Sequence, residues 1–147
     1  MFKNPVMKKH ITYLVLIVVL TAFKSYGQDF IERKHSDQFI KNCIVEVFQG
    51  ETEKLVFNST SRRYSLMKKF IKDQVVVEYR PEYAGKDFVS TNELQLNNKY
   101  NSNLQKDESY NPNTFNPLKY GISMFPSKRN IYRIGESDYI MIVSQSN

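Results

Sequence analysis

Apolar and polar positions follow a helical period over residues 36–49. Ser36 or Asp37 can cap the start of this helix, and Gly50 stands where a left-handed C-terminal cap is expected. The β-branched residues within the segment favour a strand instead, but polar side chains interrupt strict alternation on both faces. We therefore predict a helix, whose apolar half consists of Phe39, Ile40, Cys43, Ile44, Val47 and Phe48.

A second amphipathic segment, residues 61–72, predicts another helix. Hydroxyl side chains at residues 59–61 can cap its N-terminus. Its apolar face consists of Tyr64, Leu66, Met67, Phe70 and Ile71. Its basic face consists of Arg62, Lys68, Lys69 and Lys72.

Three later segments have the composition of β-strands. Residues 74–80 predict a strand that Pro81 terminates. Residues 131–134 and 139–143 flank a four-residue loop, which predicts a β-hairpin whose second strand is buried on both faces. The predicted fold class is α+β, with two N-terminal helices packed on a four- to five-stranded, mainly antiparallel sheet that ends in this C-terminal β-hairpin.

Residues 92–120, called the connection below, differ in composition from the rest of the chain. They are rich in Asn, Tyr and Pro, with eight Asn between Asn92 and Asn116 and few aliphatic side chains after Leu104. We expect a long, turn-rich segment inside one small domain that covers residues 28–147. Segments of this length without regular structure are uncommon unless they are functional or mobile.

Residues 1–27 resemble a cleaved secretory signal peptide. A basic head precedes an apolar run over residues 11–23, and the small residues Ser25 and Gly27 fit the positions that a signal peptidase recognises. The run has 13 residues, against about 20 for a membrane-spanning helix. An uncleaved anchor or a buried helix is the alternative. We predict export to the periplasm or the extracellular space, a mature start at about Gln28, and no stable membrane insertion after cleavage.

Removal of this segment changes the charge of the chain. Of the 21 basic residues, four lysines leave with residues 1–27, so that 17 basic and 15 acidic residues remain. The net charge falls from +6 to +2. Neither this charge nor the compartment favours a nucleic acid as a partner.

The single cysteine, Cys43, excludes an intramolecular disulfide. Because it lies within the apolar half of the first helix, we predict that it is buried and structural. His35 is the only histidine after residue 27, and a zinc site of nitrogen and sulfur ligands needs three or four of them. We therefore predict no metal site, no cofactor and no catalytic Cys–His pair.

Two carboxylates have similar apolar surroundings. Glu46 and Glu78 could form an acid–base pair of the kind that glycoside hydrolysis needs, but only if residues 43–48 were a strand beside residues 74–80. Two solvated charges are the alternative, and the helical pattern favours it.

The start of the second helix combines hydroxyl and guanidinium groups. Ser61, Arg62 and Arg63 stand at the positive end of the helix dipole, where cations are mildly unfavourable and an anion would be stabilised. We consider these residues as an anion-binding site. The alternative is a capped helix whose arginines point into solvent or pair with a nearby glutamate.

Aromatic residues precede asparagines in the connection. A sugar ring could stack on the aromatic rings of Tyr100, Tyr110 and Phe115, while amide side chains such as that of Asn111 hydrogen-bond its hydroxyl groups. Alternatively, the same residues could fix the connection onto the domain.

These observations predict a non-enzymatic exported binding or interaction domain. Its partner would be a glycan, an anionic group, or an envelope or secreted protein. A small carboxylate-dependent hydrolase and a structural subunit of a secreted assembly are the alternatives.

Overall fold

The first predicted helix is present in the computed structural model, which describes residues 34–146. Helix α3 spans Asp37–Phe48, and the Ser36 hydroxyl caps it by accepting a hydrogen bond from the N–H of Phe39. The predicted C-terminal cap is wrong by one residue. Gln49, not Gly50, has a positive φ of 44°, and its N–H donates to the carbonyl of Val45. The predicted signal peptide and the mature start at Gln28 lie outside the described residues.

The second helix, α4, is shorter than residues 61–72. It spans Arg63–Lys69 and continues into a wider π-helical turn, Phe70–Gln74, which leads directly into the first strand. Another π-helical turn, Glu53–Phe57, joins the two helices. The apolar face is buried as its pattern predicts, at Met67, Phe70 and Ile71.

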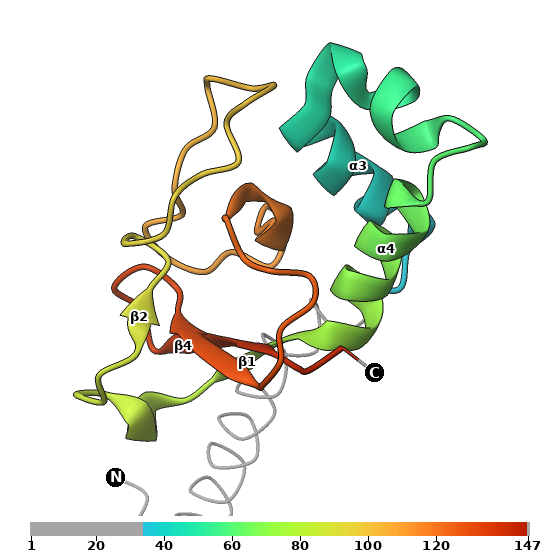
Figure 1. The fold of residues 1–147 in the computed structure, drawn as a ribbon. Helices are drawn as coiled ribbons and strands as arrows, with labels where there is room; N and C mark the ends of the chain where they lie inside the picture. The colour runs from blue at the N-terminus through green and yellow to red at the C-terminus, as the bar shows by residue number, and fades with distance from the viewer. Residues whose placement is uncertain (1–33, 147) are drawn as a thin grey trace, which may run out of the picture.

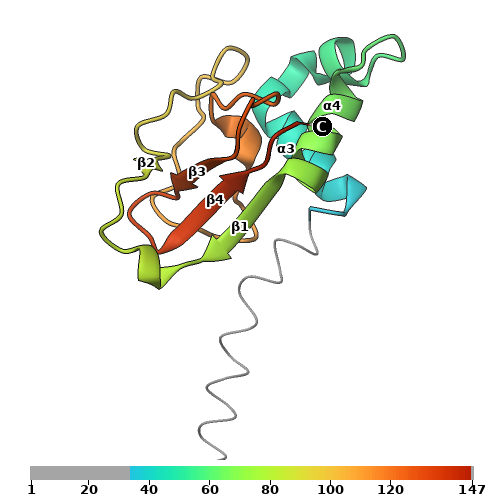
Figure 2. The same ribbon diagram turned by 60° about the horizontal axis from the view of Figure 1, so that its bottom comes forward.

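The four-stranded sheet is mixed, with the strand order β1-β4-β3-β2 (Figure 2). Strand β4 (Tyr139–Val143) is antiparallel to both β1 (Val75–Tyr79) and β3 (Asn130–Arg133), whereas β2 (Val89–Ser90) is parallel to β3. The prediction of a mainly antiparallel sheet is therefore wrong for its β2 edge. The long segment between β2 and β3 allows the chain to return to the end of the sheet where β2 begins, as a parallel pairing requires.

The α+β class is confirmed, but the arrangement of two N-terminal helices needs correction. The first described helix begins at Asp37, and further helical turns follow the first strand, at Pro81–Tyr83 and Pro117–Lys119. Figure 1 shows α3 and α4 together on one side, the strands below, and the connection opposite the helices.

The C-terminal hairpin of β3 and β4 is confirmed. Its register runs from Asn130 opposite Val143 to Arg133 opposite Ile140, and residues 140–143 of β4 are all buried, as the apolar pattern predicts. In its turn, Gly135 has a φ of 55°, and a Cβ there would collide with the backbone carbonyl of Glu108 in the connection. A glycine is therefore required where the connection crosses the hairpin.

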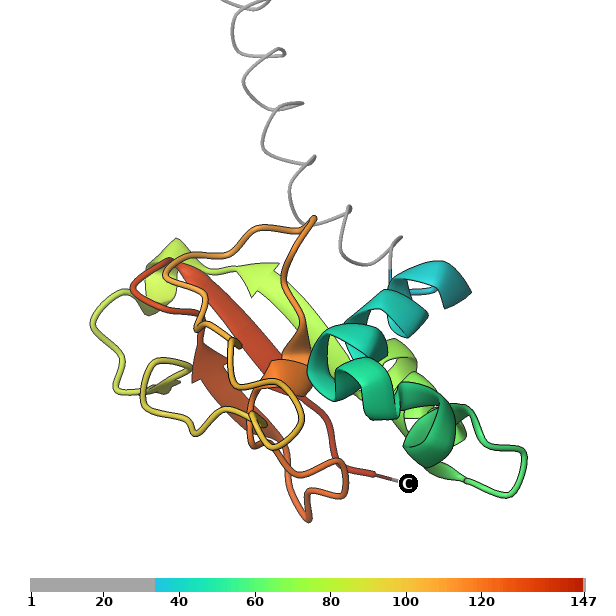
Figure 3. The same ribbon diagram turned by 90° about the horizontal axis from the view of Figure 1, so that it is seen from above.

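The core lies between the helices and one face of the sheet, and the connection contributes to it. Leu104, Phe115, Leu118 and Tyr120 are buried there beside residues of α3, α4 and the strands. Figure 3 shows the Pro117–Lys119 turn between α3 and the sheet. Within residues 34–146, no helix has both the length and the apolar character needed to cross a membrane.

Candidate functional site

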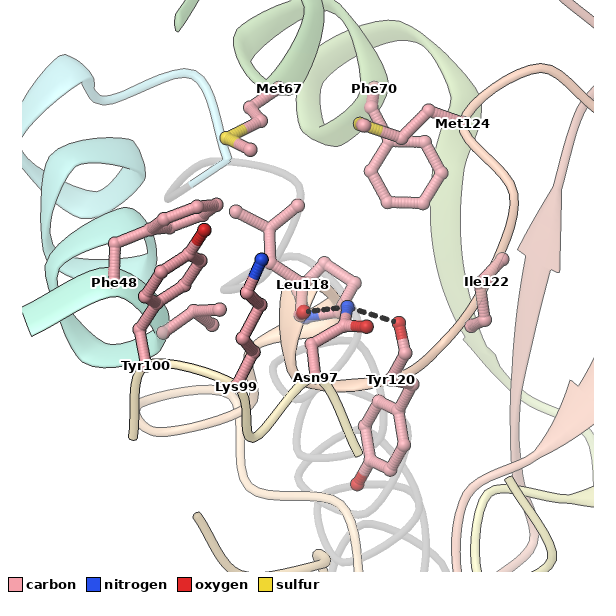
Figure 4. Close-up of a pocket in the computed structure, with 12 residues that line it drawn as sticks. Phe48, Met67, Phe70, Asn97, Lys99, Tyr100, Leu118, Tyr120, Ile122 and Met124 are labelled. Carbon is pink, nitrogen blue, oxygen red and sulfur yellow. Dashed lines mark hydrogen bonds between the residues drawn. The ribbon is translucent and has the colours of Figure 1, made fainter. Parts of the chain in front are cut away.

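An apolar pocket of about 270 Å³ lies where the two helices face the connection (Figure 4). Helix α3 contributes Val47 and Phe48, while α4 and the turn after it contribute Met67 and Phe70. The lining from the connection and the segment after it consists of Asn97, Lys99, Tyr100, Pro117, Leu118, Tyr120, Ile122 and Met124. The pocket is thus built from three separate parts of the sequence.

Two aromatic rings and one lysine form the rim. The rings of Phe48 and Tyr100 stack with their centroids 5.4 Å apart and an interplanar angle of 24°. The ammonium nitrogen of Lys99 lies 5.1 Å from the centroid of the Tyr100 ring, within the range of a cation–π interaction. Figure 4 shows this nitrogen directed into the pocket. A positive charge therefore borders an apolar space.

Two asparagines hold the rim in place. The Asn97 side-chain amide donates to the carbonyls of Leu118 and Tyr120, at 2.8 and 2.9 Å. The Asn101 amide donates to the carbonyl of Glu46 in α3, at 2.7 Å. Since Lys99 and Tyr100 lie between these two anchors in the sequence, their part of the rim is positioned before any ligand arrives.

Tyr120 contributes to the pocket without offering it an acid–base group. Its hydroxyl donates a hydrogen bond to the Asp107 carboxylate, and Figure 4 shows the hydroxyl directed away from Lys99. Burial, with this hydrogen bond, raises the pKa of Tyr120 above its ordinary value. The phenol therefore stays protonated at neutral pH.

The structure separates the residues of the candidate anion site from this pocket. The Ser61 hydroxyl donates to the carbonyl of Leu55 at 3.1 Å and accepts from the N–H of Arg63 at 3.2 Å. Arg62 and Arg63 are exposed at the start of α4, a helix of seven residues. None of the three lines the pocket with Tyr100.

The aromatic and asparagine residues of the connection fall into two groups. Tyr100 lies on the pocket rim, but Phe115 is 1% exposed, and Tyr110 is buried with its ring centroid 4.5 Å from that of Tyr139. Asn111 closes a turn, since its side-chain oxygen accepts from the N–H of Asn113. The buried rings of Tyr110 and Phe115 fix the connection onto the domain, whereas the hydrogen bond of Asn111 stays within the connection.

The two carboxylates of the hydrolase alternative have separate partners. Glu46 lies on α3, where it accepts a hydrogen bond from the side chain of Asn116 at 2.9 Å. Glu78 lies on β1, where it pairs with Arg80 at 2.6 Å. Residues 43–48 belong to helix α3, so they do not form the strand that the acid–base pair requires.

Cys43 is buried, as predicted, at 3% exposure. Burial, with the charge of Glu46, raises the pKa of its thiol to about 12. His35 is exposed. Within residues 34–146, no three His, Cys, Asp or Glu side chains converge to hold a metal ion.

Most residues of the site were not candidates from the sequence, including Phe48 and Lys99 at the rim and Met67, Ile122 and Met124 in the lining. One signal could have found part of it. Lys99 directly precedes Tyr100 and follows two asparagines, so the cation and the aromatic ring stand together in a segment whose composition suggests a ligand-binding loop.

Comparison of the chain with protein-family models, with curated proteins and with solved structures finds no match.

Proposed function

We propose that the protein is an exported, non-enzymatic binding domain that holds the apolar part of a small ligand in the pocket between α3, α4 and the connection. The observation that carries this proposal is the apolar space of about 270 Å³ behind a stacked aromatic rim. Concave, mostly apolar sites with a few polar groups are typical of small-molecule binding.

The chemistry of the lining supports binding rather than catalysis. Its ionisable side chains are Lys99, Tyr100 and Tyr120, and the hydroxyl of Tyr120 is engaged by Asp107. General acid–base catalysis needs a positioned donor and acceptor of matched pKa, most often a histidine or a carboxylate, and no residue of either kind is among the twelve that line the pocket.

Binding of N-phenyl-1-naphthylamine tests the proposal. This uncharged fluorophore emits strongly only in apolar surroundings, and its naphthyl group can enter the pocket while its phenyl ring stays at the rim. We therefore expect saturable enhancement of its fluorescence with the purified protein. Met124→Trp adds bulk to the lining and should weaken the binding at least tenfold. Phe125→Trp is the matched control, because Phe125 is 60% exposed and lies outside the lining. Equal binding by both variants and the parent would contradict the proposal.

Export has its own test. Mass spectrometry of the protein recovered outside the cytoplasm should give a chain that begins at about Gln28. A membrane-bound chain that retains residues 1–27 would contradict export in this form.

A further inference from the structure

Lys99 is the one charged residue among those that line the pocket. None of the ion pairs formed within residues 34–146 includes it. Its ammonium nitrogen lies over the face of the Tyr100 ring and is directed into the pocket (Figure 4). The described part of the chain therefore presents an ammonium group, not paired with any of its carboxylates, at the entrance of an apolar space.

This arrangement matches a ligand with two chemical parts. An apolar tail gains free energy when it leaves water for the lining of Met67, Phe70 and Leu118. A negatively charged head at the entrance would lie beside Lys99, which is itself exposed, and would be attracted to its ammonium group. An uncharged molecule would use only the first part, and a cation would be repelled by the second.

The form of the cation indicates the head group. Lysine offers a single point charge, which balances one carboxylate, whereas a phosphate monoester carries about two negative charges and three acceptor oxygens. No arginine lines the pocket. One ammonium group is the natural complement of one carboxylate.

The size of the pocket limits the tail. Because an apolar cavity of about 150 Å³ holds a benzene ring, a space of 270 Å³ corresponds to roughly ten carbon atoms. A longer chain would leave its last carbons in water.

We infer that the ligand of this pocket is a monocarboxylate amphiphile with a tail of about ten carbons, of the kind represented by a medium-chain fatty acid. The inference rests on the proposed function, because it assigns the chemistry of the molecule that the pocket takes. Lys99 pairs with the carboxylate, and the stacked rings of Phe48 and Tyr100 close over the first carbons of the tail.

Displacement of N-phenyl-1-naphthylamine measures how affinity depends on the tail and on the head group of the ligand. Each competitor is used below the concentration at which it forms micelles. Across hexanoate, octanoate and decanoate, affinity should rise about fourfold per methylene group. Beyond decanoate the affinity should level off, so that tetradecanoate binds about as tightly as decanoate does. Decanoate should bind about threefold more tightly than decan-1-ol, as one ion pair at an exposed lysine provides, and decylamine should bind most weakly.

Lys99→Met assigns the effect of charge to one residue, because it keeps an unbranched apolar stem and removes the ammonium group. Decanoate should then bind this variant no better than decan-1-ol does, while decan-1-ol binds variant and parent equally. Lys128→Met is the matched control, since Lys128 is exposed and outside the lining. It should preserve the preference for decanoate.

The outcomes separate the two proposals. If the fluorophore and every alkyl compound fail to bind the parent, the pocket is not a binding site and both proposals fail. If decan-1-ol binds the parent as well as decanoate does, or if Lys99→Met keeps the preference for the carboxylate, the inference about the head group is overturned while the pocket remains a binding site.

Discussion

The ammonium nitrogen of Lys119 lies 2.8 Å from Oδ1 of Asp107, and these side chains are only 6% and 13% exposed. The other carboxylate oxygen of Asp107 accepts the hydroxyl hydrogen of Tyr120, whose oxygen in turn accepts from the backbone N–H of Asp107. One carboxylate therefore fastens the middle of the connection to its end. Since Leu118 and Tyr120 line the pocket, this fastening also fixes one of its walls.

Lys119→Met should destabilise the protein by about 3 kcal/mol, because it leaves the Asp107 carboxylate buried without its cation. The double variant Lys119→Met with Asp107→Asn should lose less than the sum of the two single losses, since neither charge is then left unpaired. Urea unfolding measures all four proteins. Strictly additive losses would mean that the two groups do not interact.

The local elements of the fold could be predicted from the sequence. Helix α3 follows from a sustained helical period with Ser36 before it, and the hairpin of β3 and β4 follows from two apolar strands around a glycine-containing loop. Each pattern is complete within fewer than twenty residues.

The β2 edge of the sheet depends on contacts that are distant in sequence. Strand β2 has two residues and no strand pattern of its own. The hydroxyl of Ser90 donates to the carbonyl of Gly135, and the N–H of Gly135 donates to the hydroxyl of Thr91. Hydroxyl groups that bond to a turn more than forty residues away give no periodic signal.

The pocket could be predicted only in part for the same reason. Tyr100 is a candidate from the sequence because an aromatic residue in an asparagine-rich segment suggests ligand contact. Phe48 and Met124 are unremarkable where they occur, and they become part of one site only when α3 packs beside the connection. The pattern of α3 predicts that Phe48 is apolar-facing, but not which residue stacks on it.

The Cys43 thiol should resist modification in the native protein. Burial raises its pKa to about 12, so almost no thiolate exists at pH 8, and the side chain is 3% exposed. Iodoacetamide should label it only when urea unfolds the chain. Labelling of the native protein at the rate of an exposed thiol would contradict its burial.

The difference between the pKa of Cys43 in the folded and in the unfolded protein makes the free energy of unfolding depend on pH in the alkaline range. The unfolded thiol ionises near 9 and the folded one near 12, so the folded state binds more protons between these values. The contribution of Cys43 is present below pH 9 and is lost as the pH rises toward 12. The stability difference between the parent and Cys43→Ala should therefore shrink over this range, because lysines and tyrosines titrate equally in both proteins. A difference that stays constant between pH 8 and pH 11 would contradict the prediction.

The end of α3 offers a stabilising substitution. Gln49 has a φ of 44°, a region that side chains other than glycine rarely adopt. Gln49→Gly should therefore stabilise the protein by about 1 kcal/mol, measured as a rise in melting temperature.

Gly50→Ala is the contrasting variant, because Gly50 does not have a positive φ and a Cβ there meets nothing within 4 Å. The Gly50→Ala variant should be as stable as the parent or slightly more stable. A large loss from Gly50→Ala would instead support Gly50 as the left-handed cap.

Substitution of two glycines with positive φ distinguishes the cost of backbone strain from the cost of a steric collision. Gly85 has a φ of 80°, and a Cβ added there would meet nothing within 4 Å, whereas a Cβ on Gly135 would collide with the backbone of Asp107 and Glu108. Gly85→Ala should cost about 1 kcal/mol through strain alone. Gly135→Ala should cost more than about 3 kcal/mol, because the connection must also move away from the hairpin turn. Since this movement displaces the segment that carries Asp107, it should also weaken the binding of N-phenyl-1-naphthylamine, which Gly85→Ala leaves unchanged. Equal losses of stability in urea unfolding would show that the connection does not press on the turn.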